Sequence, residues 1–439
     1  MRERNGISNL CKLLVLTIVA GVGPAAAQSR QSIPATSLSP RPVVITGKQV
    51  SGVTGLPIES ISLARCVQNS LAALPFQIDE RNADGYIVPG QPHPSVKPDE
   101  QPGIFDDNDE IVFMFREITP GCETLPEGIA EKVIPVRIES EYFNPPRYIY
   151  VLVNAARKPP VPVYVRHDPV RDRTSSPFFE FGYDPKNAAI FDHLVISQIR
   201  GLEKANIIDR LKVRIISRAV ADLITIRLNE DHLKSTLYGY RAGPLRVSRL
   251  VNVVLTPVPG FTIPVTVETT QYDRLWDARV SFTLPRSLTA LMSSQEMFFI
   301  VDFRDLRGTT FVTVANPQGA VIDGITQDEE KQLNLGAEHW FFITGRGANA
   351  LMMMDTSPNL QLKFRADFVD DATYANPPEN VVGGLPSAGF HLTGWEQIRS
   401  GSYWFFGRFV TLPGFPEDGG AGWYQAFNSP IKTIAEPAR

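Results

Sequence analysis

The pattern with the clearest chemistry is an acidic turn at residues 80–87. Its candidate ligands stand at alternate positions: Glu80, Asn82 and Asp84, followed by the backbone carbonyl of Tyr86. Hard cations such as Ca²⁺ need several oxygen atoms that converge on one point, and alternate residues around a tight turn supply them. The spacing therefore predicts a calcium loop, although Gln91 stands where a bidentate glutamate usually completes such a loop.

A second acidic segment, residues 106–110, comes directly before an apolar run. It offers further oxygen ligands from Asp106, Asn108 and Glu110. If the two segments fold against each other, the second supplies the carboxylate that the first lacks. The alternative is that residues 82–85 form an ordinary turn and that the acidic segment is a solvated cap of a buried strand. Both interpretations stay open.

Large aromatic residues are concentrated in the last quarter of the chain, together with His and Arg. Aromatic rings stack on the apolar faces of sugars while polar side chains bond the hydroxyls, so this composition suits a saccharide-binding surface. The candidate ligand-binding residues are His339, Trp340, Arg346, His391, Trp395, Tyr403 and Arg408. The alternative, which residues 340–342 and 404–406 favour, is that these aromatics are strand cores.

The sequence leaves open whether the protein is an enzyme. None of its 6 histidines lies in a recognised nucleophile or zinc-hydrolase motif. No Cys-x-x-Cys-His pattern and no Gly-rich phosphate loop occurs, so we expect neither haem nor nucleotide. The net charge of −4 argues against nucleic acid as a partner. If the chain cleaves polysaccharides, a lyase in which His339, His391 or Tyr403 moves the proton is the expected mechanism.

The first residues predict export. Basic residues precede a short apolar run, and Ala25–Ala27 gives the small residues of a cleavage site, so residues 1–27 are interpreted as a signal peptide. Residues 28–42 are rich in Ser, Pro and Gln and are predicted to be a flexible lead-in. We expect a periplasmic or extracellular protein without a transmembrane segment in the mature chain.

Two cysteines remain after the signal peptide, Cys66 and Cys122. An even number of cysteines in an exported protein predicts a disulfide between them. Two buried free thiols are the alternative.

The apolar pattern along the rest of the chain mostly has a period of two. In residues 211–215, 263–267, 280–284 and 362–368, apolar side chains alternate with polar ones, which is typical of antiparallel strands with one buried face. We therefore predict an all-β protein built from antiparallel β-sandwiches. The proline-rich segment 158–162 is interpreted as a boundary between a small N-terminal domain, 43–158, and a larger sandwich, 161–430.

Two segments together resemble a signature of exported bacterial β-sandwich proteins. They are Leu74–Glu80 (LPFQIDE) and Asp106–Met114 (DDNDEIVFM), and residues 209–212 and 243–246 are similar to later parts of the same pattern. The resemblance touches most of the mature chain in scattered blocks. It implies the fold and an export route, and it transfers no catalytic residue.

Three hypotheses about function follow. The first is a non-catalytic binding or scaffold protein of the periplasm or cell surface that binds carbohydrate and is stabilised by calcium. The second is a polysaccharide-active enzyme of the lyase type. The third is an accessory subunit of a cell-surface assembly, whose partner is another exported protein.

Overall fold

The alternating segments form strands with one buried face. In the computed structural model, β12 (Ile208–Ala219), β16 (Phe261–Gln271), β17 (Leu275–Leu284) and β23 (Lys363–Val369) contain the four segments with that pattern. The apolar side chains of these strands point to a core and the alternate side chains to the other face, because successive side chains leave a strand on opposite faces; on β12 that other face is also covered, and Lys212 is fully buried. All named strand pairs are antiparallel, so the predicted all-β sandwich fold is confirmed.

The structure describes residues 40–126, 128–155, 162–258, 260–412 and 421–438. The predicted signal peptide and the lead-in up to residue 39 therefore lie outside the described residues. So do residues 158–161 of the predicted domain boundary.

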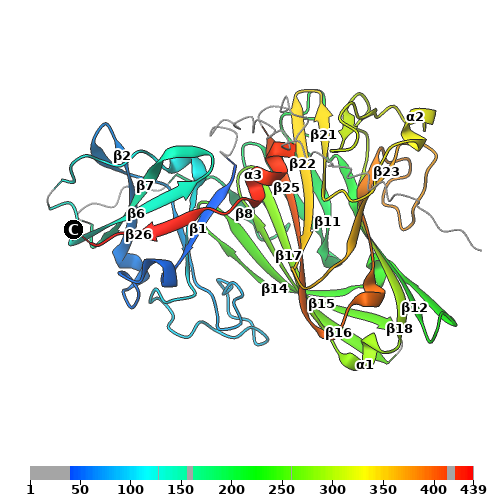
Figure 1. Cartoon of the computed structure of the whole chain (residues 1–439), viewed down its shortest axis with the longest axis horizontal. Coiled ribbons are helices and arrows are strands. Elements are labelled where there is room, and N and C mark those ends of the chain that lie inside the picture. Colours follow the sequence, from blue (N-terminus) through cyan, green and yellow to red (C-terminus); the bar gives the residue numbers. More distant parts are fainter. Residues whose placement is uncertain (1–39, 127, 156–161, 259, 413–420, 439) are drawn as a thin grey trace, which may run out of the picture. The chain divides into compact units, whose positions relative to one another are not determined.

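The N-terminal region is a sandwich of two small sheets (Figure 1). A three-stranded sheet has the order β1-β5-β4 and a five-stranded sheet has the order β26-β6-β7-β2-β3. Ile45 and Phe113 of the first sheet share one core with Val136 and Val151 of the second. The strands are β1 (Pro42–Thr46), β2 (Ile61–Val67), β3 (Ser70–Ala73), β4 (Gln77–Asp79), β5 (Glu110–Met114), β6 (Lys132–Ser140), β7 (Phe143–Val153) and β26 (Lys432–Ala435).

The remaining strands build the larger sandwich. A nine-stranded sheet, β14-β15-β16-β17-β25-β22-β21-β19-β20, shares its core with a five-stranded sheet, β13-β12-β18-β24-β23, and with a four-stranded sheet, β11-β10-β9-β8. The strands not yet given are β8 (Arg166–Asp168), β9 (Arg173–Ser175), β10 (Phe179–Asp184), β11 (Asn187–Ile196), β13 (Ile224–Leu228), β14 (Lys234–Ala242), β15 (Val247–Val258), β18 (Met292–Phe303), β19 (Thr310–Val312), β20 (Ala320–Val321), β21 (Trp340–Gly345), β22 (Ala348–Thr356), β24 (Ser387–Thr393) and β25 (Gly401–Leu412).

Strand β5 connects the two sandwiches because it is buried on both faces. Ile111 and Phe113 point into the N-terminal core. Val112 and Met114 point the other way, into a cluster with residues of the nine-stranded sheet such as Leu275. This agrees with the sequence, in which every residue from 111 to 114 is apolar. The outer face of the large sheet is thus fixed next to the loops around β5.

Helices are few and short in the described residues. They are α1 (Arg286–Thr289), α2 (Asp328–Lys331) and α3 (Ala421–Asn428). The acidic segment after Thr326 forms the helix α2. A capping box begins it, in which the side chains of Gln327 and Glu330 each bond the backbone of the other residue. Within the described part of the chain, no helix is long and apolar enough to cross a membrane.

The predicted disulfide is present. Cys66, at the end of β2, is bonded to Cys122, with the two Cα atoms 5.4 Å apart. The bond ties the loop after β5 to β2, the strand next to the edge strand β3 of the five-stranded N-terminal sheet.

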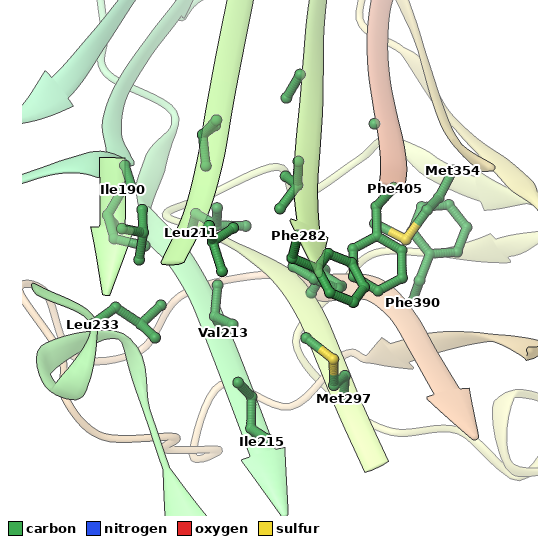
Figure 2. A pocket seen from close by; sticks show the side chains of 18 of the residues that line it. Ile190, Leu211, Val213, Ile215, Leu233, Phe282, Met297, Met354, Phe390 and Phe405 are labelled. Carbon is green, nitrogen blue, oxygen red and sulfur yellow. The ribbon is translucent and has the colours of Figure 1, made fainter. Parts of the chain in front are cut away.

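The core of the larger sandwich is not completely filled. A cavity of about 170 Å³ lies between the two large sheets and is lined almost entirely by apolar side chains (Figure 2). Val213 and Met297 border it from the five-stranded sheet, and Phe282 and Phe405 border it from the nine-stranded sheet. Such a lining offers water no hydrogen bonds, so we expect the cavity to be dry.

Candidate functional site

Strand register assembles a row of polar and aromatic side chains on the outer face of the nine-stranded sheet. Glu268 of β16 is paired with Arg279 of β17, and Arg279 is paired with Phe406 of β25. Their neighbours in sequence, such as Val267 and Val280, point to the opposite face and contribute to the core. Cross-strand neighbours on one face lie side by side, so the three side chains form one continuous strip.

The next residues of the same face extend the strip in both directions. Asp277 is paired with Arg408, and the Arg408 guanidinium donates two hydrogen bonds to that carboxylate at 2.7 and 2.9 Å. On the other side, Ser281 is paired with Trp404. The guanidinium of Arg279 lies 5.7 Å from the centre of the Trp404 ring. The floor of the site therefore combines aromatic faces, guanidinium groups and a hydroxyl.

A loop of the N-terminal sandwich forms the opposite wall. This loop, residues 80–88, is a small hairpin closed by the bond from Val88 N to Glu80 O. Arg81 reaches from it to the sheet and bonds both carboxylate oxygens of Glu268, at 2.7 and 2.8 Å. The amide of Ile87 also donates to Glu268. Glu268 thus bonds the loop at two residues, Arg81 and Ile87, and holds it against the sheet.

Between the loop and the strip lies a hollow of about 340 Å³, which we call the polar hollow. Its lining includes Arg81, Asp84, Tyr86, Glu110, Arg246, Glu268, Thr270, Tyr272, Asp277, Arg279, Ser281 and Phe406. These residues come from both sandwiches, so the site exists only where the N-terminal loops meet the large sheet.

Arginine side chains hold Glu110, a carboxylate of the polar hollow, in the charged form. Burial would raise the pKa of Glu110, but the guanidinium groups of Arg246 and Arg81 outweigh burial and lower it to about 2. Arg246 itself is almost fully buried and also bonds Asp79 and the hydroxyl of Tyr272. Glu110 is therefore an anion at neutral pH and has no proton to donate.

Arg279 is the exception among the arginines of the hollow. Its side chain is exposed, and no described carboxylate forms an ion pair with it. Its five N–H donors remain able to bind a ligand, next to the half-buried rings of Trp404 and Phe406. This combination of a guanidinium group beside aromatic faces can bind a planar or ring-shaped polar ligand.

The predicted ligand-binding residues are distributed over three places. Trp340, Trp395 and Tyr403 are buried in cores, and the Tyr403 hydroxyl donates to the Arg399 carbonyl. Arg346 lies in the turn between β21 and β22 and donates to the carbonyl of Arg200. The other three lie on outer faces of the sheets: Arg408 belongs to the strip, and His339 and His391 line a separate hollow.

His339 and His391 do share a surface. Both line a second hollow of about 560 Å³ together with Phe364 and Arg365 of β23. His391 contacts the carboxylate of Glu296 at 3.2 Å and stacks on a phenylalanine ring, whereas His339 lies 3.6 Å from the carboxylate of Asp355. Each histidine thus has its own acidic partner.

The two acidic segments predicted to bind calcium meet in space. The side-chain amide of Asn108 donates to the carbonyl of Asn82 at 3.2 Å. The predicted carboxylate ligands, however, bond other groups: Glu80 accepts from Gly103 N and Arg241, Asp84 pairs with Lys97, and Glu110 pairs with the two arginines named above. The Asn82 side-chain oxygen accepts from the amides of Asp84 and Tyr86.

A different set of carboxylates converges beside that contact. Oxygen atoms of Asp99, Asp106 and Asp109 all lie within 4.8 Å of one another. Of these, sequence spacing identified Asp106 and missed the other two. Asp99 comes from the connection between the two segments, and no periodic pattern distinguishes it from the exposed acidic residue that follows.

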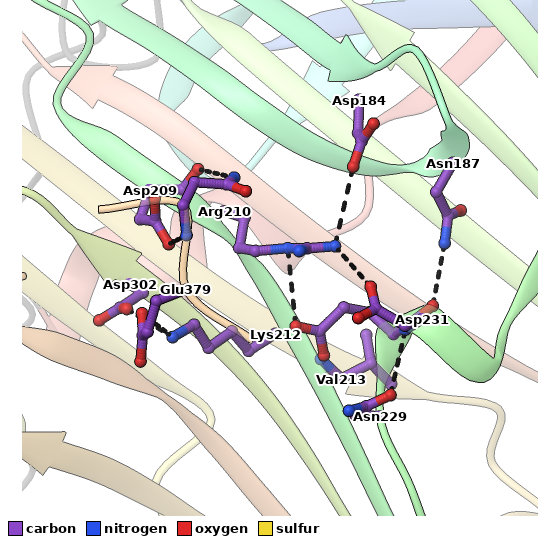
Figure 3. A network of polar contacts seen from close by, with 12 residues as sticks. Asp184, Asn187, Asp209, Arg210, Lys212, Val213, Asn229, Asp231, Asp302 and Glu379 are labelled. Carbon is purple, nitrogen blue, oxygen red and sulfur yellow. Dashed lines mark hydrogen bonds and ion pairs between the residues drawn. The ribbon is translucent and has the colours of Figure 1, made fainter. Parts of the chain in front are cut away.

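A second acidic group, Asp209, Asp302 and Glu379, already has its cation. Lys212 is fully buried and bonds Asp302 at 2.7 Å and Glu379 at 2.5 Å (Figure 3). It also donates to the carbonyl of Asn376. The ammonium group occupies the place that a metal ion would need, so this group is interpreted as a structural ion-pair network.

Comparisons with known proteins reveal likeness in structure alone. No family model and no curated protein matches the sequence. Among solved structures, the chain is similar to an α-mannosidase from Enterococcus faecalis, with 8% identity and a TM-score of 0.45 over 92% of this chain and 45% of that one. It is also similar to a glycosyl hydrolase family 38 protein from Enterococcus faecalis, with 7% identity and a TM-score of 0.47 over 92% and 47%. A galactose mutarotase-like protein from Clostridium acetobutylicum has 8% identity and a TM-score of 0.33 over 57% and 98%. The chain spans less than half the length of the first two.

Proposed function

We propose that this chain is an exported, non-catalytic carbohydrate-binding protein of the periplasm or cell surface, and that the saccharide binds in the polar hollow. The observation that carries the proposal is the strip on the large sheet, where the exposed Arg279 lies across from Phe406 and its guanidinium is 5.7 Å from the centre of the Trp404 ring. Rings of this kind stack on sugars, and a guanidinium bonds hydroxyl or carboxylate oxygens in pairs. A sugar unit with a carboxylate would use Arg279 best.

Binding without turnover is favoured by the charges of the hollow. A glycosidase needs one carboxylic acid that keeps its proton near neutral pH. Glu110 has a pKa of about 2, and Glu268 and Asp277 are each held by an arginine. Glu110 therefore has no proton to transfer, and the arginines fix the orientation of Glu268 and Asp277. The disulfide between Cys66 and Cys122 supports the export part of the proposal, because such bonds persist in oxidising compartments.

Gel retardation in a panel of neutral and acidic polysaccharides tests the proposal. We expect one acidic polymer to retard the protein, and Arg279→Ala to weaken this binding about tenfold or more, since a hydrogen bond to a charged group contributes about 1.5–3 kcal/mol. Arg227→Ala is the matched control, because Arg227 is also an exposed strand arginine but lies in β13 of the other sheet. Equal loss in both variants would contradict a site at the polar hollow.

Chain length of the polymer, measured after the same incubation, separates binding from catalysis. Unchanged length supports a binding protein. Shortening that depends on His339 or His391 would replace the proposal with the lyase hypothesis and move the site to the histidine hollow. No retardation by any polymer would favour the accessory-subunit hypothesis, which co-purification with a partner would then test.

A further inference from the structure

Three carboxylates from neighbouring loops converge near the polar hollow without a basic side chain between them. Asp99 comes from the connection after the 80–88 loop, and Asp106 and Asp109 come from the turn before β5. Their oxygen atoms lie within 4.8 Å of one another, a separation that allows one ion to contact all three. No lysine or arginine among the described residues forms an ion pair with any of them.

Asp99 carries the decisive observation. Its side chain is only 5% exposed, and neither of its carboxylate oxygens has a hydrogen-bond partner. The amides of Glu100 and Gln101 are near enough to favour its charge, but neither reaches hydrogen-bonding geometry. A carboxylate that is both buried and unpaired is costly, so a buried acid almost always has a partner. A partner for the Asp99 carboxylate would lie at the centre of the cluster, where the oxygens of the three aspartates converge.

Asn108 stands between Asp106 and Asp109 in the sequence and carries a further oxygen. Its side-chain NH₂ group is committed to the carbonyl of Asn82, and this orients the amide oxygen the other way. That oxygen is also enclosed and has no hydrogen-bond partner. Carboxylate and amide oxygens together are the ligands that hard cations prefer.

The carboxylates are held in place by backbone amides. Asp109 accepts from Arg81 N at 2.9 Å and from Asp106 N at 3.0 Å, and Asp106 accepts from Asn108 N at 3.1 Å. Gly47 packs directly on this turn: a Cβ at Gly47 would lie 1.8 Å from the carbonyl oxygen of Asp106. The donor atoms are therefore positioned by the fold before any ion arrives.

We propose that Asp99, Asp106 and Asp109, with the amide oxygen of Asn108, bind one hard divalent cation, and that this cation is Ca²⁺. Three carboxylates on one ion fit Ca²⁺ better than Mg²⁺, which is usually bound by one or two and keeps several waters. The site differs from the loop pattern of the sequence, whose residues Glu80, Asp84 and Glu110 bond protein groups instead.

Calorimetric titration of the full chain with CaCl₂, after removal of metal by chelator, tests this proposal. We expect one Ca²⁺ per chain, weaker binding of MgCl₂, and a higher unfolding temperature with Ca²⁺ than with chelator. Asp99→Asn should weaken Ca²⁺ binding at least about tenfold, because it removes one of three charged ligands. Asp107→Asn is the matched control, since Asp107 is the exposed neighbour outside the cluster, and it should bind Ca²⁺ like the unmodified protein.

The same variants show whether loss of binding is only loss of folding. Asp99→Asn removes a buried unpaired charge, so in chelator it should unfold at the same temperature as the unmodified protein or a higher one. Absence of Ca²⁺ binding to the unmodified chain would overturn the proposal. So would unchanged binding to Asp99→Asn, or an equal loss in Asp107→Asn, which would indicate a diffuse effect of surface charge. The test does not depend on whether the polar hollow binds a saccharide.

Discussion

Arg246 donates its Nε–H to the carboxylate of Asp79 over 2.7 Å, and both side chains are almost completely buried. Arg246 stands at the start of β15 in the large sheet, whereas Asp79 ends β4 in the N-terminal sandwich. One ion pair thus joins the two sandwiches beneath the polar hollow. Gln77 strengthens the joint, because its side chain bonds the Asp79 carboxylate and the amides of Leu245 and Arg246.

Replacement of Arg246 should therefore destabilise the whole fold. Arg246→Met removes the nearest cation from the buried Asp79 carboxylate, which keeps only Arg241 at 3.8 Å, and breaking a buried pair in this way costs about 3–5 kcal/mol of the free energy of unfolding. Denaturant unfolding measures the loss. Lys331→Met, which breaks an exposed pair with Asp328, should cost less than about 1 kcal/mol.

The double variant Asp79→Asn, Arg246→Met makes this prediction sharper. It removes the Asp79 charge together with Arg246, while Glu110, the other carboxylate that Arg246 bonds, keeps Arg81, so the double variant should be more stable than Arg246→Met alone. A double variant that is less stable than the single one would show that the cost comes from lost packing and not from the buried carboxylate.

A glycine in the core of the large sandwich predicts a stabilising substitution. Gly407 lies within β25 beside the apolar cavity, and a Cβ at this position would meet no atom within 4 Å. Gly407→Ala should raise the free energy of unfolding by about 0.4–1 kcal/mol, because alanine restricts the unfolded chain. Gly389→Ala in β24 is the contrasting variant: its Cβ would lie 2.0 Å from the carbonyl oxygen of Phe299, so we expect clear destabilisation. Thermal unfolding measures both effects. Unfolding midpoints that move in the same direction for the two variants would contradict this prediction.

The strands were predictable because their period of two reflects burial on one face, which is a local property of the sequence. The disulfide was predictable because only two cysteines follow the signal peptide. The polar hollow was not, since Glu268, Arg279 and Phe406 become neighbours through strand register over 138 residues of sequence. In the sequence, Glu268 and Arg279 look like ordinary solvated strand residues, and Phe406 looks like part of a strand core. The aromatic residues could not be divided into core and surface residues for a related reason. Composition alone does not distinguish Trp340, which is buried in a core, from Trp404, which is half-buried beside Arg279.

Loss of the disulfide should weaken the N-terminal sandwich. The bond between Cys66 and Cys122 closes a loop with a sequence separation of 56 residues. In the chain-entropy model, opening a loop of this length lowers the free energy of unfolding by about 4 kcal/mol. The variant with both cysteines replaced by serine, compared with the unmodified protein in denaturant, measures this difference. If the unmodified protein already unfolds identically with and without a reducing agent, the bond contributes nothing to stability.

The pair of His339 and Asp355 should make stability depend on pH. The contact with Asp355 raises the pKa of His339, and burial, which opposes this, is the smaller effect. A histidine whose pKa is raised by folding stabilises the protein below its unfolded pKa of about 6.5, and this stabilisation is lost as the pH rises through the higher folded pKa. The unfolding temperature should therefore fall between pH 6 and pH 8, by a small amount because two-fifths of the His339 side chain is exposed. His339→Gln should remove this part of the pH dependence, whereas His93→Gln, at a histidine without an acidic partner among the described residues, should retain it. Identical pH profiles for His339→Gln and the unmodified protein would show that the contact with Asp355 does not affect folding.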